Sequence, residues 1–255
     1  MAGEQTTKGI EKYDYQTALT NFWAGRRQTS LEFLTSTLTN NPNHSDMFAM
    51  YRLWIEILAT EHRSKSMSML LEHIQMRGIL HSDHATTFAA LRALIHLELD
   101  EHQAVKLYER SLEESKDNPY AAEFFAAIQN RRANQVDEQV LEVMSKSDDY
   151  FHLQRVFISY KLTNQVQPIR SAITHIQQVF PGTPLPYEYN LQSSWDAKDW
   201  QAAKEQARSL VSMFPGNIEN YITLGLCSLK LFHTCLLYTS PSPRDQRGSR
   251  MPSSA

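Results

Sequence analysis

The stretch that decides the fold is residues 198–231, KDWQAAKEQARSLVSMFPGNIENYITLGLCSLKL. Two helical patterns lie on either side of the Phe-Pro-Gly triplet at 214–216. In the first pattern Ala203, Ala207 and Leu210 recur on one face of a helix. Because the residue before a proline avoids helical geometry, the triplet predicts a turn between two antiparallel helices.

The same arrangement recurs one period earlier in the chain. A second Phe-Pro-Gly triplet stands at 180–182, and the two prolines, Pro181 and Pro215, are 215 − 181 = 34 residues apart. Counted back from each proline, Ile169 and Ala203 have the same offset. A fixed period of this length indicates a repeat array in which each helix pair packs on the next.

Taken together, these residues resemble the tetratricopeptide repeat, whose pattern is a large residue, Leu-Gly, a second large residue, then Ala, an aromatic residue and Pro. The resemblance covers residues 11–232 and is strongest over 85–232. The positions that carry it, all interpreted as packing residues, are Ala104, Tyr108, Tyr160, Pro181, Ala203, Pro215, Tyr221, Leu224 and Gly225.

The resemblance implies an all-α fold, a right-handed superhelical array of antiparallel helix pairs. We expect about thirteen helices and no strand, with residues 13–234 forming six repeats and the first helix of another. Small residues such as Ala203 and Gly225 are expected where helices cross closely, and Tyr221 is expected to fill the space beside them. Residues 78–84 are expected to form an extra loop that breaks the period.

The two ends of the chain are expected to lie outside the array. Residues 1–12 are polar and are predicted to be disordered. Residues 235–255 resemble a translated sequencing adapter and are interpreted as a non-native tail. On this interpretation the natural protein continues beyond residue 234 and its C-terminal part is missing.

Charge and cysteine content limit the class of protein. The net charge is −3, and without the +2 of the tail it is −3 − 2 = −5, which argues against nucleic acid as the main partner. Cys227 is the one cysteine before the tail, which argues against a disulfide framework and favours a reducing compartment. We therefore expect a cytoplasmic protein, and the sequence shows no apolar run of membrane-spanning length.

No motif in the sequence points to catalysis or to a cofactor. None of the eight glycines falls in a phosphate-binding loop pattern. His81, Asp83 and His84 are close in sequence, but their spacing matches no metal-site pattern, and a solvated loop is the favoured interpretation. The prediction is a protein without catalytic residues, without a metal and without a cofactor.

The resemblance implies a scaffold or adaptor that binds a protein or peptide segment in the concave groove of the superhelix. A carboxylate-clamp pattern is absent from the matching positions. The polar or amphipathic residues predicted to face the groove are His96, Asn130, Lys161, Gln192 and Trp195. One alternative is a recruitment arm of a larger enzyme whose catalytic domain is missing, and RNA binding by helical repeats is disfavoured by the acidic charge.

Overall fold

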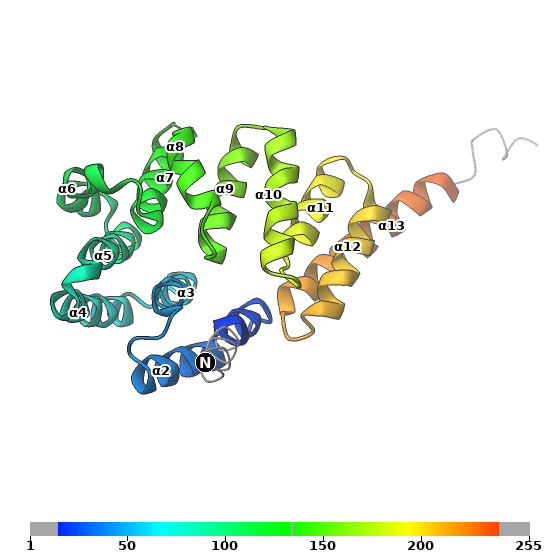
Figure 1. Ribbon diagram of the computed structural model, residues 1–255. Helices are drawn as coiled ribbons and strands as arrows, with labels where there is room; N and C mark the ends of the chain where they lie inside the picture. The colour runs from blue at the N-terminus through cyan, green and yellow to red at the C-terminus, as the bar shows by residue number, and fades with distance from the viewer. Residues whose placement is uncertain (1–14, 134, 240–255) are drawn as a thin grey trace, which may run out of the picture. The chain divides into compact units, whose positions relative to one another are not determined.

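The computed structural model describes residues 15–133 and 135–239, and this part of the chain is helical with no strand (Figure 1). The expectations for residues 1–12 and for most of the 235–255 segment fall outside the described residues. A helix over residues 15–23 comes first. The helices that follow are α2 (Arg27–Asn40), α3 (Met47–Thr60), α4 (Ser64–Leu80), α5 (Ala85–Leu99), α6 (Glu101–Leu112), α7 (Pro119–Ala133), α8 (Glu138–Ser145), α9 (Tyr150–Leu162), α10 (Val166–Val179), α11 (Leu185–Asp196), α12 (Trp200–Met213) and α13 (Ile218–Thr239).

The chain divides into two compact units, Met1–Thr183 and Pro184–Ala255. In the first unit each helix packs on at least one chain neighbour, and alternate helices also pack on each other: α3 on α5, α5 on α7 and α7 on α9. In the second unit α12 packs against both α11 and α13. Each unit is therefore built from antiparallel helix pairs, as the 34-residue period predicts.

The turn inside a helix pair has the same backbone geometry in four repeats. Gly25, His62, Asn164 and Lys198 each have a positive φ, between 53° and 75°. At each turn this residue donates its N–H to the carbonyl three residues back, and the next residue donates to the carbonyl five residues before itself. These two bonds define the Schellman motif, which ends a helix with one left-handed residue. The last two of these positions are 198 − 164 = 34 residues apart, so the period is visible in the backbone itself.

Lys198→Gly is expected to raise the free energy of unfolding by about 1 kcal/mol, because a side chain costs about that much at a left-handed residue and glycine does not. Gly25→Ala at the equivalent position is expected to lower it by a similar amount. Urea unfolding followed by circular dichroism measures both variants. Changes of the same sign in the two variants would contradict the shared-turn interpretation.

The turn between helix pairs is also repeated. Asn41, His81, Phe180 and Phe214 each end a second helix with φ near −124° to −132° and ψ of 68° to 80°. In each case the N–H three residues later donates to the carbonyl of this residue, at 3.0–3.2 Å. Pro42, Pro181 and Pro215 follow three of these residues, but serine follows His81. The segment 78–84 is therefore not an extra loop as predicted: α4 continues to Leu80, and a repeat turn of the usual geometry follows.

The close helix crossing that the sequence predicts at Gly225 is found at Gly78 instead. A Cβ added to Gly225 would meet nothing within 4 Å, and Tyr221 is 48% exposed, so the expected tight packing at these two residues is wrong. A Cβ added to Gly78 would lie 3.0 Å from the Cβ of Phe88, which is 1% exposed. Gly78 therefore lets α4 approach α5 closely. Ala203, in contrast, is fully buried in the second unit.

Gly78→Ala and Gly225→Ala are expected to change stability in opposite directions. Alanine is favoured over glycine inside a helix by about 0.8–1 kcal/mol, and Gly225→Ala should gain most of this because the site is open. At Gly78 the new methyl group would press on a fully packed phenylalanine, and overpacking costs about 1–3 kcal/mol. Thermal and urea unfolding of dilute protein test both variants. Stabilisation by Gly78→Ala would show that Phe88 can move aside.

The other helix end that differs from prediction is α13. The sequence predicts that residues 235–255 lie outside the array as a tail, whereas α13 runs to Thr239 and includes Cys235. Among the described residues, no helix is long and apolar enough to cross a membrane.

Candidate functional site

The inner side of the first unit is occupied by its own side chains. α3 contacts α9, which lies three helix pairs further along the chain, and Figure 1 shows α3 inside the curve traced by α4–α9. The helix over residues 15–23 also reaches α9, since Phe22 and Trp23 make edge contacts with Phe151 and Tyr150, at ring-centroid distances of 6.2 and 5.0 Å. These contacts bring the first helices of distant pairs together on the inner side of the first unit.

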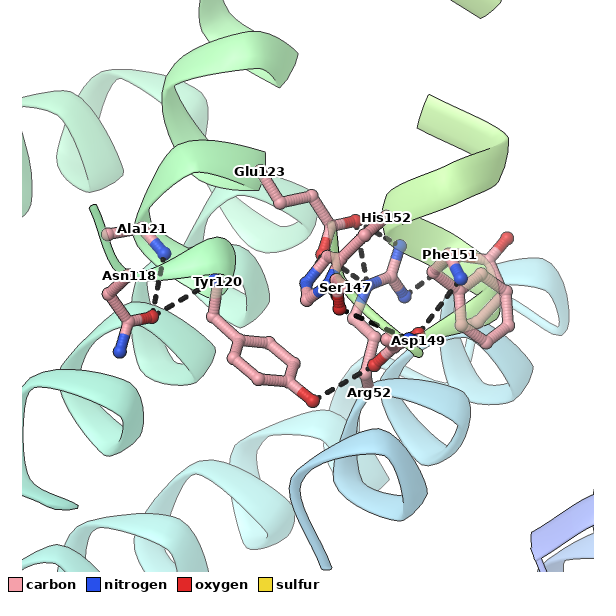
Figure 2. A network of polar contacts seen from close by, with 10 residues as sticks. Arg52, Asn118, Tyr120, Ala121, Glu123, Ser147, Asp149, Phe151 and His152 are labelled. Carbon is pink, nitrogen blue, oxygen red and sulfur yellow. Dashed lines mark hydrogen bonds and ion pairs between the residues drawn. The ribbon is translucent and has the colours of Figure 1, made fainter. Parts of the chain in front are cut away.

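A buried ion pair lies at the centre of this packing (Figure 2). Arg52 of α3 reaches Glu123 of α7 with two nitrogens: Nη2 lies 2.8 Å from Oε1, and Nε donates to Oε1 and Oε2 at 2.8 and 3.0 Å. The Arg52 side chain is 6% exposed and that of Glu123 is fully buried. A third nitrogen of Arg52 pairs with Glu56 at 3.1 Å, and the guanidinium carbon lies 4.5 Å from the ring centre of Phe151.

Polar groups at the start of α9 complete what we call the buried polar cluster: Arg52, Tyr120, Glu123, Ser147, Asp149 and His152. His152 is fully buried, with Nε2 3.5 Å from the Glu123 carboxylate and Nδ1 2.7 Å from the Ser147 hydroxyl. Asp149 caps α9 by accepting from the Phe151 N–H at 2.9 Å. It also accepts from the Tyr120 hydroxyl at 3.0 Å. The cluster thus connects α3, α7 and α9.

The charges in the cluster shift the ionisation of its members. Burial alone would raise the pKa of Glu123, but the charges of Arg52 and His152 and the Arg52 hydrogen bond outweigh burial and lower it. The pKa of Asp149 is raised, mainly by burial and also by the neighbouring Glu123, against a lowering effect of His152. Burial and Asp149 raise the pKa of Tyr120 well above its usual value. Glu123 is therefore held charged, as its partner Arg52 requires.

This arrangement acts as a clamp between helices. A carboxylate beside an imidazole can move protons, but Glu123 and His152 are both 0% exposed, so a substrate cannot reach them in this state. Among the described residues, no group of three or more potential metal ligands lies close enough together to hold an ion. His81 and His84 instead lie beside aromatic rings, at 6.5 Å from Phe88 and 5.2 Å from Phe48.

This clamp is not among the features predicted from the sequence, although the sequence carries a signal for it. Arg52 is a single basic residue in the apolar run FAMYRLWIEIL, and Glu123 is a single acidic residue in PYAAEFFAAI. A lone charge in a helix that is apolar on most of its surface is expected to be buried and paired. Which charge pairs with which could not be found from spacing, because the two residues are 71 positions apart.

The five predicted groove residues divide between the two units. In the first unit His96 is half-buried beside Tyr108, Lys161 is exposed, and Asn130 is 8% exposed and donates to the Ser159 hydroxyl at 3.1 Å. Asn130 is therefore turned towards α9. Gln192 and Trp195 belong to the second unit, where Gln192 donates to Asp196 and Trp195 makes an edge contact with Trp200.

The packing residues inferred from the resemblance differ in how deeply they are buried. Ala104 and Tyr108 are buried in the core between α5 and α8, and Tyr160 packs against that core while partly exposed. Pro181 and Pro215 are exposed, and the phenylalanines before them, Phe180 and Phe214, are the buried members of each triplet at 4% exposure. Leu224 is partly buried.

A groove open to solvent lies on the outer side of the first unit, between α8 and α10. Two cavities of about 930 and 850 Å³ share Ser145, Tyr160 and Pro168 and so form one continuous groove. α8 has 8 residues, against 14 in α10, so it covers less of α9. The floor includes the apolar side chains of Leu153 and Val156 on α9.

One wall of this groove carries uncharged polar side chains at helical spacing. Gln167, Ser171, Thr174 and Gln178 of α10 line the groove at intervals of four, three and four residues, and all four are exposed. This spacing places them in one row along the helix. Amide and hydroxyl groups above an apolar floor can bind a polypeptide backbone and its apolar side chains at the same time.

Comparison with known proteins shows what this fold is similar to. No protein-family model matches the chain, and no curated protein matches it in sequence. A solved structure, titled "Crystal structure of APC/C hetero-tetramer Cut9-Hcn1", matches with a TM-score of 0.58 at 14% sequence identity. The match covers 84% of this chain and 42% of the other, so this chain spans less than half of that tetratricopeptide protein. The chain therefore has the all-α fold of a tetratricopeptide-type array of antiparallel helix pairs.

Proposed function

We propose that this protein is an interaction scaffold that binds an extended segment of another protein in the outer groove between α8 and α10. The observation that carries the proposal is the continuous groove with its row of amide and hydroxyl side chains on α10. The outer groove is preferred over the concave binding expected from the sequence because the buried polar cluster joins α3, α7 and α9 in the first unit. The similar solved protein forms a hetero-tetramer, and partner binding by this chain would be consistent with that fold.

The chemistry of the half of the groove beside α10 favours an extended, uncharged segment. That cavity is lined by no Asp, Glu, Lys or Arg and its floor is apolar, whereas the cavity beside α8 is lined by Glu138 and Glu142. Extended backbone exposes N–H and C=O groups on both edges, and glutamine can donate to one and accept from the other. Alternate side chains of such a segment would lie on Leu153 and Val156, in the manner of other peptide-recognition grooves.

A displayed library of random peptides, selected on the full chain, tests the proposal. Peptides selected by the wild-type chain are expected to lose about tenfold or more in affinity on Ser171→Arg, because a long charged side chain would fill the groove. Gln177→Arg is the matched control, since Gln177 is exposed on the same helix and does not line the groove. Both positions are exposed, so neither change should alter the melting curve.

The original expectation of concave binding is tested in the same experiment. Lys161→Glu changes an exposed residue of α9 that was predicted to face the concave side. If selected peptides lose affinity on Lys161→Glu and keep it on Ser171→Arg, the outer-groove proposal is wrong. Failure to select any peptide that distinguishes Ser171→Arg from Gln177→Arg would also overturn it.

We further propose a cytoplasmic location and a protein partner in preference to nucleic acid. The support is the acidic net charge of −3 and the buried free thiol of Cys227, which suits a reducing compartment. Fractionation of cells that produce the tagged protein would place it, and recovery with membranes or in an oxidising compartment would contradict the proposal.

A further inference from the structure

One face of α13 is apolar and uncovered within the described residues of the second unit. The opposite face packs on α12: Cys227 is fully buried, and Asn220 donates to the Leu210 carbonyl at 3.3 Å. The exposed fractions of the large apolar side chains on the open face range from 46% to 74%, for Ile218, Tyr221, Ile222, Leu226 and Leu229.

This face is symmetric in sequence about Gly225. Positions 221 and 229 lie four residues before and after the glycine, and positions 218 and 232 lie seven before and after it. Steps of four and seven keep residues on one face of a helix, so large side chains flank a single small residue on both sides. The four flanking residues are Ile218, Tyr221, Leu229 and Phe232.

From this symmetry we infer that two copies of the chain associate through α13, in an antiparallel crossing centred on Gly225. Two helices related by a two-fold axis present the same patch to each other, so residue i contacts residue j and j contacts i. Tyr221 of one copy would lie opposite Leu229 of the other, and Ile218 opposite Phe232. Gly225 would meet Gly225, and the absence of side chains there lets the helix axes approach.

The area involved predicts a reversible dimer. The exposed apolar side chains of this face present roughly 500 Å² per copy, so two copies would remove about 1,000 Å² from water. That is the lower end of the range for specific interfaces, which corresponds to a weak or transient association. No charged side chain lies in the row formed by residues 218, 221, 222, 225 and 229, so pairing two copies places no like charges opposite each other in that row.

Sedimentation velocity of the full chain over a range of concentrations tests the association. The wild-type chain is expected to convert from monomer to dimer as its concentration rises. Leu229→Arg places two charges in each interface and should weaken dimerisation about a hundredfold or more. Ser212→Arg, an exposed residue of α12 away from this face, is the matched control and should dimerise as the wild type does.

Gly225→Ala separates dimerisation from folding. The added methyl group meets nothing inside one chain, so the monomer should become more stable, as predicted above. In the dimer two methyl groups would meet at the crossing, so the dimer should become weaker. A variant with a more stable monomer and an unchanged dimer would show that the crossing is not at Gly225.

Cysteine crosslinking tests the register. In a background with Cys227→Ala and Cys235→Ala, Gly225→Cys should form a disulfide between copies on mild oxidation. An Ile218→Cys chain mixed with a Phe232→Cys chain should form the mixed disulfide in preference to 218–218 pairs. Preferential 218–218 pairing would mean a parallel arrangement and would overturn the proposal.

Other occupants of this face are distinguished by the same measurements. A chain that stays monomeric at all concentrations, or a dimer that is insensitive to Leu229→Arg, overturns the inference. A dimer that appears only after residues 240–255 are removed also overturns it, because that segment would then compete with a second copy for the face. Since α13 is remote in sequence from the α8–α10 groove, Ser171→Arg should leave dimerisation unchanged, so this proposal and the peptide-binding proposal can fail separately.

Discussion

Glu123→Ala is expected to lower the free energy of unfolding by about 3–5 kcal/mol, because it leaves the buried guanidinium of Arg52 without its main partner. Arg52 makes its closest contacts with Glu123, and the remaining ion pair to Glu56 reaches a carboxylate that is 34% exposed. Urea unfolding of the full chain followed by circular dichroism measures the change. An exposed ion pair serves as the control: Glu142→Ala, which removes the partner of Lys146, should leave the unfolding curve almost unchanged.

The double variant Arg52→Met, Glu123→Leu tests whether the Arg52–Glu123 ion pair adds net stability or only determines how the helices pack. Replacing both members of a buried ion pair by apolar residues of similar size is often neutral or stabilising, whereas removing one member leaves an unpaired charge. We expect the double variant to recover most of the loss caused by Glu123→Ala. If the double variant unfolds as easily as the single variant, the ion pair contributes net stability. The contacts of the pair with His152 and Phe151 would then be part of that contribution.

The pH dependence of Glu123→Gln follows from the lowered pKa of Glu123. A carboxyl group whose pKa is lower in the folded chain contributes stability above its unfolded pKa, which is about 4.3. That contribution is lost as pH falls through the folded pKa. The stability difference between wild type and Glu123→Gln should therefore be constant near neutral pH and should shrink as the pH drops below about 4. A stability difference between wild type and Glu123→Gln that grows on acidification would contradict a lowered pKa for Glu123.

Phe214→Ala is expected to cost about 3–5 kcal/mol, because it removes a large buried side chain at the repeat turn. Phe214 is 4% exposed, and its N–H and C=O make the turn bonds to Leu210 and Asn217. Phe180→Ala, at the same position in the first unit, should cost a similar amount. Phe180 also makes an edge contact with Tyr150 at 5.6 Å.

Pro215→Ala is the control for this prediction. Pro215 is exposed, and the change acts mainly through the freedom of the unfolded chain, which corresponds to about 0.4–1 kcal/mol. Thermal unfolding monitored by circular dichroism compares the variants. A larger loss for Pro215→Ala than for Phe214→Ala would mean that the proline, and not the buried aromatic ring, determines the turn.

The local structure of this protein could be predicted from its sequence because it depends on residues a few positions apart. The apolar spacing around Ala203 and Leu210 fixed the buried face of a helix, and the Phe-Pro-Gly triplets at 180–182 and 214–216 marked two turns of the same geometry. The all-α class and the pairing of neighbouring helices follow from such patterns, since each helix must cover its apolar face with the next element along the chain. The solved structure with the same fold agrees with this interpretation.

The tertiary structure alone decided which surfaces are open. The sequence predicts a close crossing at Gly225 and a loop at Gly78, and only the positions of their neighbours show that the close contact is at Gly78 and not at Gly225. The Arg52–Glu123 pair is buried between α3 and α7, and a groove lies beside the short α8. These features depend on the small rotation between successive helix pairs, which accumulates along the array until helices three repeats apart meet. Sequence spacing specifies each turn but not the total rotation accumulated over several helix pairs. The location of the open groove therefore could not be derived from the sequence.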